Sequence, residues 1–317
     1  MTMRPMLFLV PVVLVLGAAA WWLWNRPRLP DAATVAAAYA TPLAPPDHPL
    51  SVYHLGHSLV GRDMPAMLAQ LAGAGHTYAL QLGWGTSLKE HWEPGLTING
   101  FAAENDTPQF RPAAEAIGSG DYDAVVLTEM VELRDAIKYH DSPVYLRKWA
   151  DLARAANPDT RVYLYESWHA LDTPDGWLTR LDDDLESLWV NKLLLPDLAQ
   201  DGLPRPIHVI PAGQVMARFV RAVEARGGVD NIRSREDLFA RTADGALDPI
   251  HPGDLGLYLV ALTHYAVLYG RSPVGLPYQL NRADGTPATA PGPVAARLMQ
   301  ETVWQVVASY PKTGVAQ

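Results

Sequence analysis

Five short apolar runs alternate with longer helical stretches along most of this chain. The runs cover residues 51–55, 77–82, 122–128, 161–166 and 207–210. The helical stretches cover 62–72, 142–156, 176–198 and 213–226, and three more follow the last run, at 233–241, 255–269 and 293–307. Apolar strands separated by helices are typical of a parallel sheet covered on both faces. The pattern therefore predicts an α/β fold of three layers, α/β/α, with a five-stranded parallel sheet.

The chain begins with a different pattern, a long apolar run over residues 6–24 that follows Arg4 and carries three tryptophans near its end. As a helix, this run has about the length that spans the ~30 Å hydrocarbon core of a bilayer, and tryptophans favour the membrane interface. Residues 1–25 are therefore predicted to anchor the protein in the inner membrane, with the rest of the chain outside the cytoplasm. The alanines at 18–20 leave open a signal peptide that is removed before secretion.

Residues 26–50 link this run to the first predicted strand and contain six prolines. Proline restricts the backbone and removes a hydrogen-bond donor, so the segment is predicted to be a partly extended stalk or wrapping segment. One short helix is expected near 31–39. Residues 51–317 are predicted to form one domain, because single α/β domains often reach this length.

Charge and cysteine content exclude several functions. The net charge of −9 gives no field that attracts nucleic-acid phosphates, so DNA and RNA are not expected as partners. The chain has no cysteine, which excludes disulfides, a thiolate nucleophile and cysteine-ligated metals.

The carboxyl ends of parallel strands are where such sheets bind ligands. Directly after the first predicted strand stand Gly56, His57, Ser58 and Leu59. A serine here, at the start of a helix, has free backbone N–H groups beside it that can stabilise a developing oxyanion. The structural alternative is that Ser58 only caps the following helix.

A second candidate motif is Asp248-Pro249-Ile250-His251, just before the helix at 255–269. Imidazole is a suitable base for a serine hydroxyl near neutral pH, and a carboxylate can fix its tautomer. An aspartate three residues before a histidine, in a proline-restrained loop, supplies both groups. Ser58, Asp248 and His251 are therefore the predicted catalytic residues, and their chemistry needs no cofactor. The alternative is a capping aspartate beside an incidental surface histidine.

The two motifs, in this order, resemble those of the SGNH (GDSL-type) hydrolases, a family of esterases, lipases and carbohydrate deacetylases. There, a serine in a Gly-Asp-Ser-Leu motif follows the first strand and a late Asp-x-x-His completes a triad. The resemblance covers roughly residues 51–275. It implies a flavodoxin-like sheet and cleavage of an acyl ester or of an O-acetyl group, with a glycan among the possible substrates. His57 stands where the family has aspartate.

The resemblance also implies an oxyanion hole with backbone N–H groups from Ser58 and Gly85. The family's asparagine after the third strand is missing, and Thr128 and Glu129 stand there. An ionised carboxylate accepts hydrogen bonds but donates none. The third donor is therefore expected to be the Thr128 hydroxyl or a Glu129 that burial keeps protonated, or the hole has two donors only.

Trp168 and His169 follow the fourth predicted strand and are candidate substrate-binding residues. An indole can stack on a sugar face and an imidazole can bond to its hydroxyls. The alternative places Trp168 in the core and His169 on the surface. The core alternative also applies to Trp84, because most tryptophans pack in cores.

Three other functions remain open. Acyl transfer to a sugar hydroxyl uses the same triad as hydrolysis. Metal-dependent hydrolysis draws on His54 and His57, with Asp248 and His251, as ligands. A non-catalytic glycan-binding protein on the same scaffold is the third, and Glu129 is its main support because it replaces an oxyanion donor.

Overall fold

The computed structural model describes residues 29–200 and 205–316. At its centre lies a sheet of five parallel strands in the order β2-β1-β3-β4-β5. The strands are β1 (Ser51–His57), β2 (Thr77–Gly83), β3 (Ala124–Leu127), β4 (Arg161–Glu166) and β5 (His208–Pro211). No strand end differs from its predicted position by more than two residues. The predicted α/β class and five-stranded parallel sheet are confirmed.

The strand order places the end of β1 at a special point of the sheet. β1 pairs with β2 on one side and β3 on the other, with Leu55 opposite Gln81 and Leu127. Sheets with this order bind ligands outside the carboxyl ends of the strands, where the direction of strand addition reverses. That reversal lies between β1 and β3, directly before Ser58.

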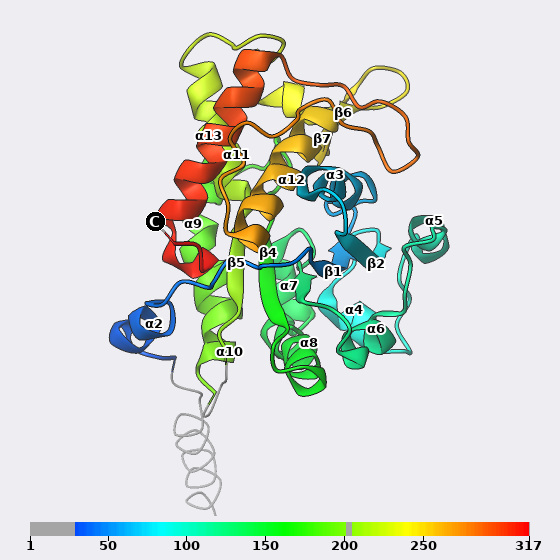
Figure 1. Ribbon diagram of the computed structural model, residues 1–317. Coiled ribbons are helices and arrows are strands. Elements are labelled where there is room, and N and C mark those ends of the chain that lie inside the picture. The colour runs from blue at the N-terminus through cyan, green and yellow to red at the C-terminus, as the bar shows by residue number, and fades with distance from the viewer. Residues whose placement is uncertain (1–28, 201–204, 317) are drawn as a thin grey trace, which may run out of the picture.

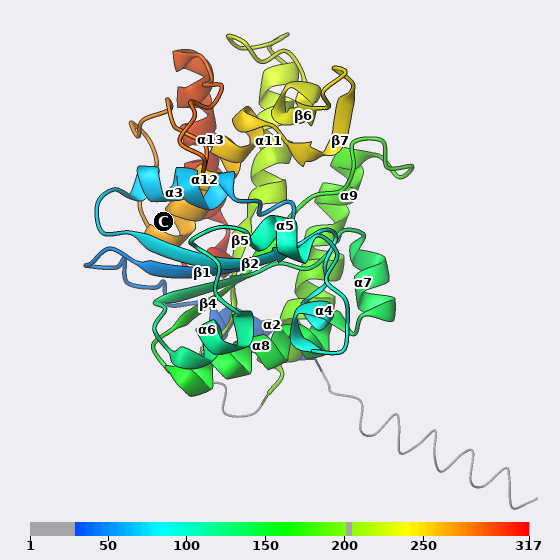
Figure 2. The same ribbon diagram turned by 90° about the vertical axis from the view of Figure 1, so that its right-hand side faces the viewer.

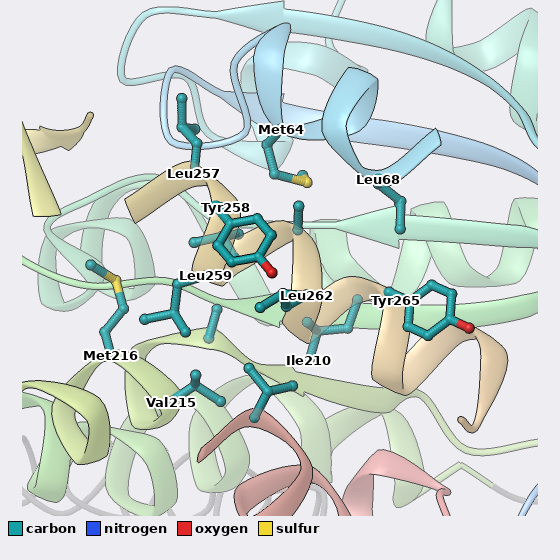
Figure 3. Packing of buried hydrophobic residues seen from close by; sticks show 14 of the residues in the cluster. Met64, Leu68, Ile210, Val215, Met216, Leu257, Tyr258, Leu259, Leu262 and Tyr265 are labelled. Atoms are coloured by element: carbon teal, nitrogen blue, oxygen red, sulfur yellow. The ribbon is translucent and has the colours of Figure 1, made fainter. Parts of the chain in front are cut away.

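One face of the sheet is covered by α3 (Asp63–Ala72), α11 (Ala212–Glu224), α12 (Asp254–Tyr269) and α13 (Pro293–Ser309), which lie together above the strands in Figure 1. In α12 every residue after Asp254 is buried. Figure 3 shows Tyr258 and Leu262 of α12 between Met64 of α3 and Val215 of α11. A helix that is apolar all round belongs in a core, and α12 lies in the middle of this layer.

The opposite face is covered by α6 (Ala113–Ser119), α8 (Ser142–Ala156) and the π-helical segment η1 (Leu185–Leu194) (Figures 1 and 2). Their apolar residues form a second core with the other side of the strands, including Leu55, Leu127 and Trp149. Helices therefore cover both faces, as a three-layer α/β/α fold requires. α9 (Trp177–Asp184), η1 and α10 (Leu195–Leu198) follow one another over the stretch predicted as one helix.

Short helices connect the main elements. They are α4 (Leu88–Trp92) and α5 (Phe101–Asn105) after β2, α7 (Leu133–Tyr139) after β3, and η3 (Pro311–Thr313) near the C-terminus. The long connection after β2 thus contains α4 and α5 before α6, and it carries Gly85 to the cavity beside Ser58.

One predicted helix, at 233–241, is wrong. The chain forms a single 3₁₀ turn, η2 (Arg235–Leu238), and then strand β6 (Phe239–Arg241), which pairs antiparallel with β7 (Leu247–Pro252). Ser234 and Asp237 form a capping box that begins the turn, but Phe239 is buried in the core opposite Pro252. Burial of this side chain stops the helix, and the resulting hairpin carries Asp248 and His251.

The proline-rich segment lies against the domain from residue 29 onward. It contains α2 (Ala32–Ala38), inside the range predicted for a short helix. Tyr39 donates a hydrogen bond to Ile207 O at 2.8 Å, and Leu43 N donates to Gly314 O at 2.7 Å. The predicted anchor, residues 1–25, lies outside the described residues and stays a prediction. Among the described helices none is both long and apolar enough to cross a bilayer.

Candidate active site

The three predicted catalytic side chains meet at the carboxyl edge of the sheet. Ser58 directly follows β1, while Asp248 and His251 lie on β7. His251 Nε2 is 3.0 Å from Ser58 Oγ, and His251 Nδ1 is 2.8 Å from Asp248 Oδ2. These are the hydrogen-bond distances that a nucleophile, a base and an orienting carboxylate need.

Asp248 is built to stay ionised. Burial alone raises the pKa of this carboxyl, but the backbone N–H groups of His251 and Ile250 both donate to its Oδ1, each at 3.0 Å. These bonds and the contact with the imidazole outweigh burial, and the pKa lies below its ordinary value. The carboxylate therefore holds the proton of His251 on Nδ1, which leaves Nε2 free to accept from Ser58.

The predicted oxyanion donors are the backbone N–H groups of Ser58 and Gly85. Ser58 and Gly85 both line the cavity beside His251. Among the described residues, neither N–H donates to a protein acceptor. Gly85 has φ +57°, a left-handed conformation suited to glycine. Both N–H groups therefore remain candidates for the oxyanion donors that the sequence predicts.

The structure does not bring the Thr128 and Glu129 side chains to this cavity. The Thr128 hydroxyl is buried and donates to Tyr165 O at 2.8 Å. Glu129 Oε1 accepts from Leu88 N and Met130 N, at 3.2 and 2.8 Å. Burial raises the pKa of Glu129 to about 7 although these bonds favour the charged form. Neither side chain lines the cavity, which leaves the Ser58 and Gly85 N–H groups as the candidate donors.

His57, the departure from the family motif, is a structural residue. Its ring is buried, with Nε2 2.8 Å from Glu129 O and Nδ1 3.4 Å from Leu59 N. A carbonyl only accepts and an N–H only donates, so the ring is the neutral tautomer with its proton on Nε2. Burial lowers the pKa of His57 to about 4. The ring thereby ties the turn that carries Ser58 to the end of β3.

The cavity around Ser58 has a volume of about 540 Å³, within the usual range for sites that bind small molecules. Its apolar wall includes Leu59, Val131 and Ile250. Trp84 and Glu104, from the connection after β2, complete it. The sequence pattern predicts no site role for Glu104, and for Trp84 it favours a position in the core. The one available signal was that Trp84 precedes Gly85.

Comparisons with known proteins inform the fold only. No family model matches this chain, and a search of curated proteins gave no match. A solved structure of a DUF4886 family protein from Bacteroides uniformis ATCC 8492 superposes with a TM-score of 0.51 and 14% sequence identity. The match covers 83% of this chain and 96% of that one. At this identity the similarity shows a shared fold, and the chemistry must be argued from the geometry of the site.

Trp168 and His169 do not line the cavity. Trp168 is buried and its indole N–H donates to Ile250 O at 2.9 Å. His169 is buried too, with Nε2 2.9 Å from Asp184 Oδ2 and 3.0 Å from an Arg180 nitrogen. Trp168 therefore packs in the core, as one of the two alternatives had it, but the surface position which that alternative gave to His169 is wrong, because the ring is buried beside Asp184 and Arg180. The Trp168 indole supports the strand that carries His251.

A second serine–histidine contact differs from that of Ser58. Ser87 Oγ is 3.0 Å from His140 Nδ1, but this hydroxyl also donates to Glu90 Oε2 at 2.8 Å. Ser87 and Glu90 form the capping box of α4, and Ser87 is fully buried. This serine has a structural role and is a matched control for Ser58.

The residues of the metal-dependent alternative do not converge. His54 is fully buried on β1, and its ring lies 6.0 Å from that of His264, measured between centroids. His57 points to Glu129 O, and Asp248 and His251 bond to each other. Within the described part of the chain, no three His, Asp or Glu side chains form a metal-binding group.

Proposed function

We propose that this chain is a serine hydrolase that cleaves ester bonds, with Ser58 as nucleophile, His251 as base and Asp248 as the group that orients it. The observation that carries the proposal is the pair of contacts at His251, 3.0 Å to Ser58 Oγ and 2.8 Å to Asp248 Oδ2. The order of the motifs along the chain and the strand order of the sheet also support the resemblance to the SGNH hydrolases.

In the proposed reaction, Ser58 Oγ attacks the acyl carbonyl carbon while its proton passes to His251 Nε2. The negative charge moves to the carbonyl oxygen, which the Ser58 and Gly85 N–H groups stabilise. Collapse of this intermediate breaks the ester bond, and the leaving alcohol takes the proton from His251. Water then attacks the acyl-enzyme in the same way, and release of the acid restores Ser58.

The first test is the identity of the nucleophile. We expect an alkyl fluorophosphonate to label wild-type protein on the peptide that contains Ser58, and Ser58→Ala to abolish labelling and hydrolysis of short acyl esters. Ser87→Ala is the matched control, because this serine also contacts a histidine, and it should still be labelled. Labelling that persists in folded Ser58→Ala protein contradicts the assignment.

A further inference from the structure

Trp84 differs from the other tryptophans near the sheet. It is 54% exposed and lines the Ser58 cavity, whereas Trp149, Trp168, Trp177 and Trp189 are buried. It directly precedes Gly85, whose N–H is a proposed oxyanion donor. A group that lies on this indole is therefore in the same cavity as the Ser58 hydroxyl.

The exposed indole is held in one orientation. A side chain at Gly100 would collide with the Trp84 ring, so the ring packs directly on this backbone. Its Nε1–H donates to Glu104 Oε1 at 2.7 Å, and its backbone N–H donates to Asn99 O at 2.8 Å. Contacts on the ring and on the backbone fix the side chain before any ligand arrives. A fixed side chain loses little conformational entropy on binding, which favours a binding surface.

Glu104 brings a carboxylate to the same wall of the cavity. Oε1 accepts from the indole, and Oε2 has no partner in the described part of the chain. A free carboxylate oxygen is a strong acceptor for hydroxyl groups of a ligand. The cavity thus offers an aromatic surface and a hydroxyl acceptor side by side, with Ser58 in the same hollow.

We propose that Trp84 and Glu104 form a saccharide subsite, and that the substrate is an O-acylated sugar. This inference rests on the proposed ester hydrolysis at Ser58. A pyranose has an apolar C–H face that matches an indole, and hydroxyls at its rim that can donate to Glu104.

Other ligand classes fit this wall less well. A fatty acyl chain would bury the charged Glu104 carboxylate with Oε2 unpaired, which is costly. A phosphate or a polyanionic ligand would be repelled by Glu104 and by a chain of net charge −9. A neutral, hydroxyl-rich alcohol moiety satisfies both residues.

The test compares two acetyl esters that differ in their alcohol. Hydrolysis of a mono-acetylated methyl β-glucoside and of ethyl acetate is followed in a pH-stat for wild type, Trp84→Ala, Trp84→Phe and Glu104→Gln. For Trp84→Ala we expect the ratio of kcat/KM, sugar ester over ethyl acetate, to fall 10- to 100-fold, mainly through KM. Trp84→Phe should recover most of the loss, and Glu104→Gln should lower the ratio as well. Tyr139→Ala is the control, because Tyr139 is 59% exposed and does not line the cavity.

The two proposals fail in different ways. An unchanged ratio in Trp84→Ala overturns the saccharide subsite. The subsite is also overturned when wild type is active, by hydrolysis of ethyl acetate or by labelling at Ser58, and yet shows no preference for the sugar ester. The ester-hydrolase proposal fails when wild type hydrolyses neither ester and no phosphonate labels Ser58.

Discussion

Replacement of Asp248 by asparagine is the sharpest test of how the site works. Asp248 accepts three hydrogen bonds, two from backbone N–H groups at Oδ1 and one from His251 Nδ1 at Oδ2. In Asp248→Asn the amide oxygen can keep the two backbone bonds, and the amide NH₂ then faces Nδ1. A donor in that place favours the tautomer with its proton on Nε2. That tautomer cannot accept the proton of Ser58.

The size of the effect follows from the charge. When His251 takes the proton it becomes a cation, and its Nδ1 lies 2.8 Å from Asp248 Oδ2. Two unit charges about 4 Å apart attract by about 4 kcal/mol at an effective dielectric constant of about 20. The His251 side chain is 43% exposed, so solvent screens part of this attraction. We therefore expect Asp248→Asn to lose about 2–3 kcal/mol of electrostatic stabilisation of the His251 cation. This loss corresponds to a rate about 30- to 150-fold lower, before any effect of the tautomer.

The assay is the rate of fluorophosphonate labelling at Ser58, because it needs no knowledge of the substrate. We expect the pseudo-first-order rate to fall at least about 30-fold in Asp248→Asn. Asp244→Asn is the control, since Asp244 lies in the turn of the same hairpin and contacts Thr242 rather than the site. A labelling rate within twofold of wild type, in a variant with an unchanged circular dichroism spectrum, would refute this reasoning.

Two further variants test the surroundings of the site. Burial raises the pKa of Glu166 from its ordinary 4.5 to about 8, so the folded protein retains a proton that the unfolded chain releases. The stability this proton confers is complete below pH 4.5 and is lost as the pH rises through 8. In urea titrations, the free energy of unfolding of wild type should fall by about 2–3 kcal/mol relative to that of Glu166→Gln between pH 5.5 and 7.5. The same pH dependence of this free energy in both proteins would rule this out. Trp168→Phe removes the indole donor to Ile250 O; it should lower stability by about 1–3 kcal/mol and slow labelling because His251 is displaced. Trp149→Phe, which loses an indole hydrogen bond on the other face of the sheet, should lower stability but leave the labelling rate unchanged.

The sheet was predictable because its strands are buried on both faces. Residues 52–57 of β1 are all buried, so the strand appears in the sequence as a mainly apolar run that only His54 interrupts before Gly56. The same holds for β3, with all four residues buried. A run of this kind, followed by glycine and a helix, fixes both the strand and the position of Ser58 at its end.

Features that depend on distant partners were not predictable. Nothing near Phe239 in the sequence shows that it packs opposite Pro252 and ends a helix. Trp84 and Trp168 both follow strands, and their different surroundings come from far along the chain. Gly100 and Glu104 hold the Trp84 indole at the cavity, whereas the Trp168 indole donates to Ile250 O in the core. Sequence adjacency identifies the candidates, whereas the tertiary partner decides which one can meet a ligand.

The nucleophile and the base are held by different parts of the fold. Buried neutral imidazoles fix the turn around Ser58: His57 donates to Glu129 O, and His91 Nε2 donates to Gly56 O at 2.8 Å. Burial lowers the pKa of both rings to about 4, so they keep these bonds unchanged across neutral pH.

The base, in contrast, lies on a peripheral hairpin rather than on the sheet. Besides its pairing with β6, two hydrogen bonds from the segment after β4 hold this hairpin, from the Trp168 indole to Ile250 O and from Leu171 N to Pro249 O at 2.8 Å. The position of His251 therefore depends on β6 and on the segment after β4 as well as on the sheet. Substitutions near Trp168 and Leu171 should act on the proton transfer and leave the oxyanion donors in place.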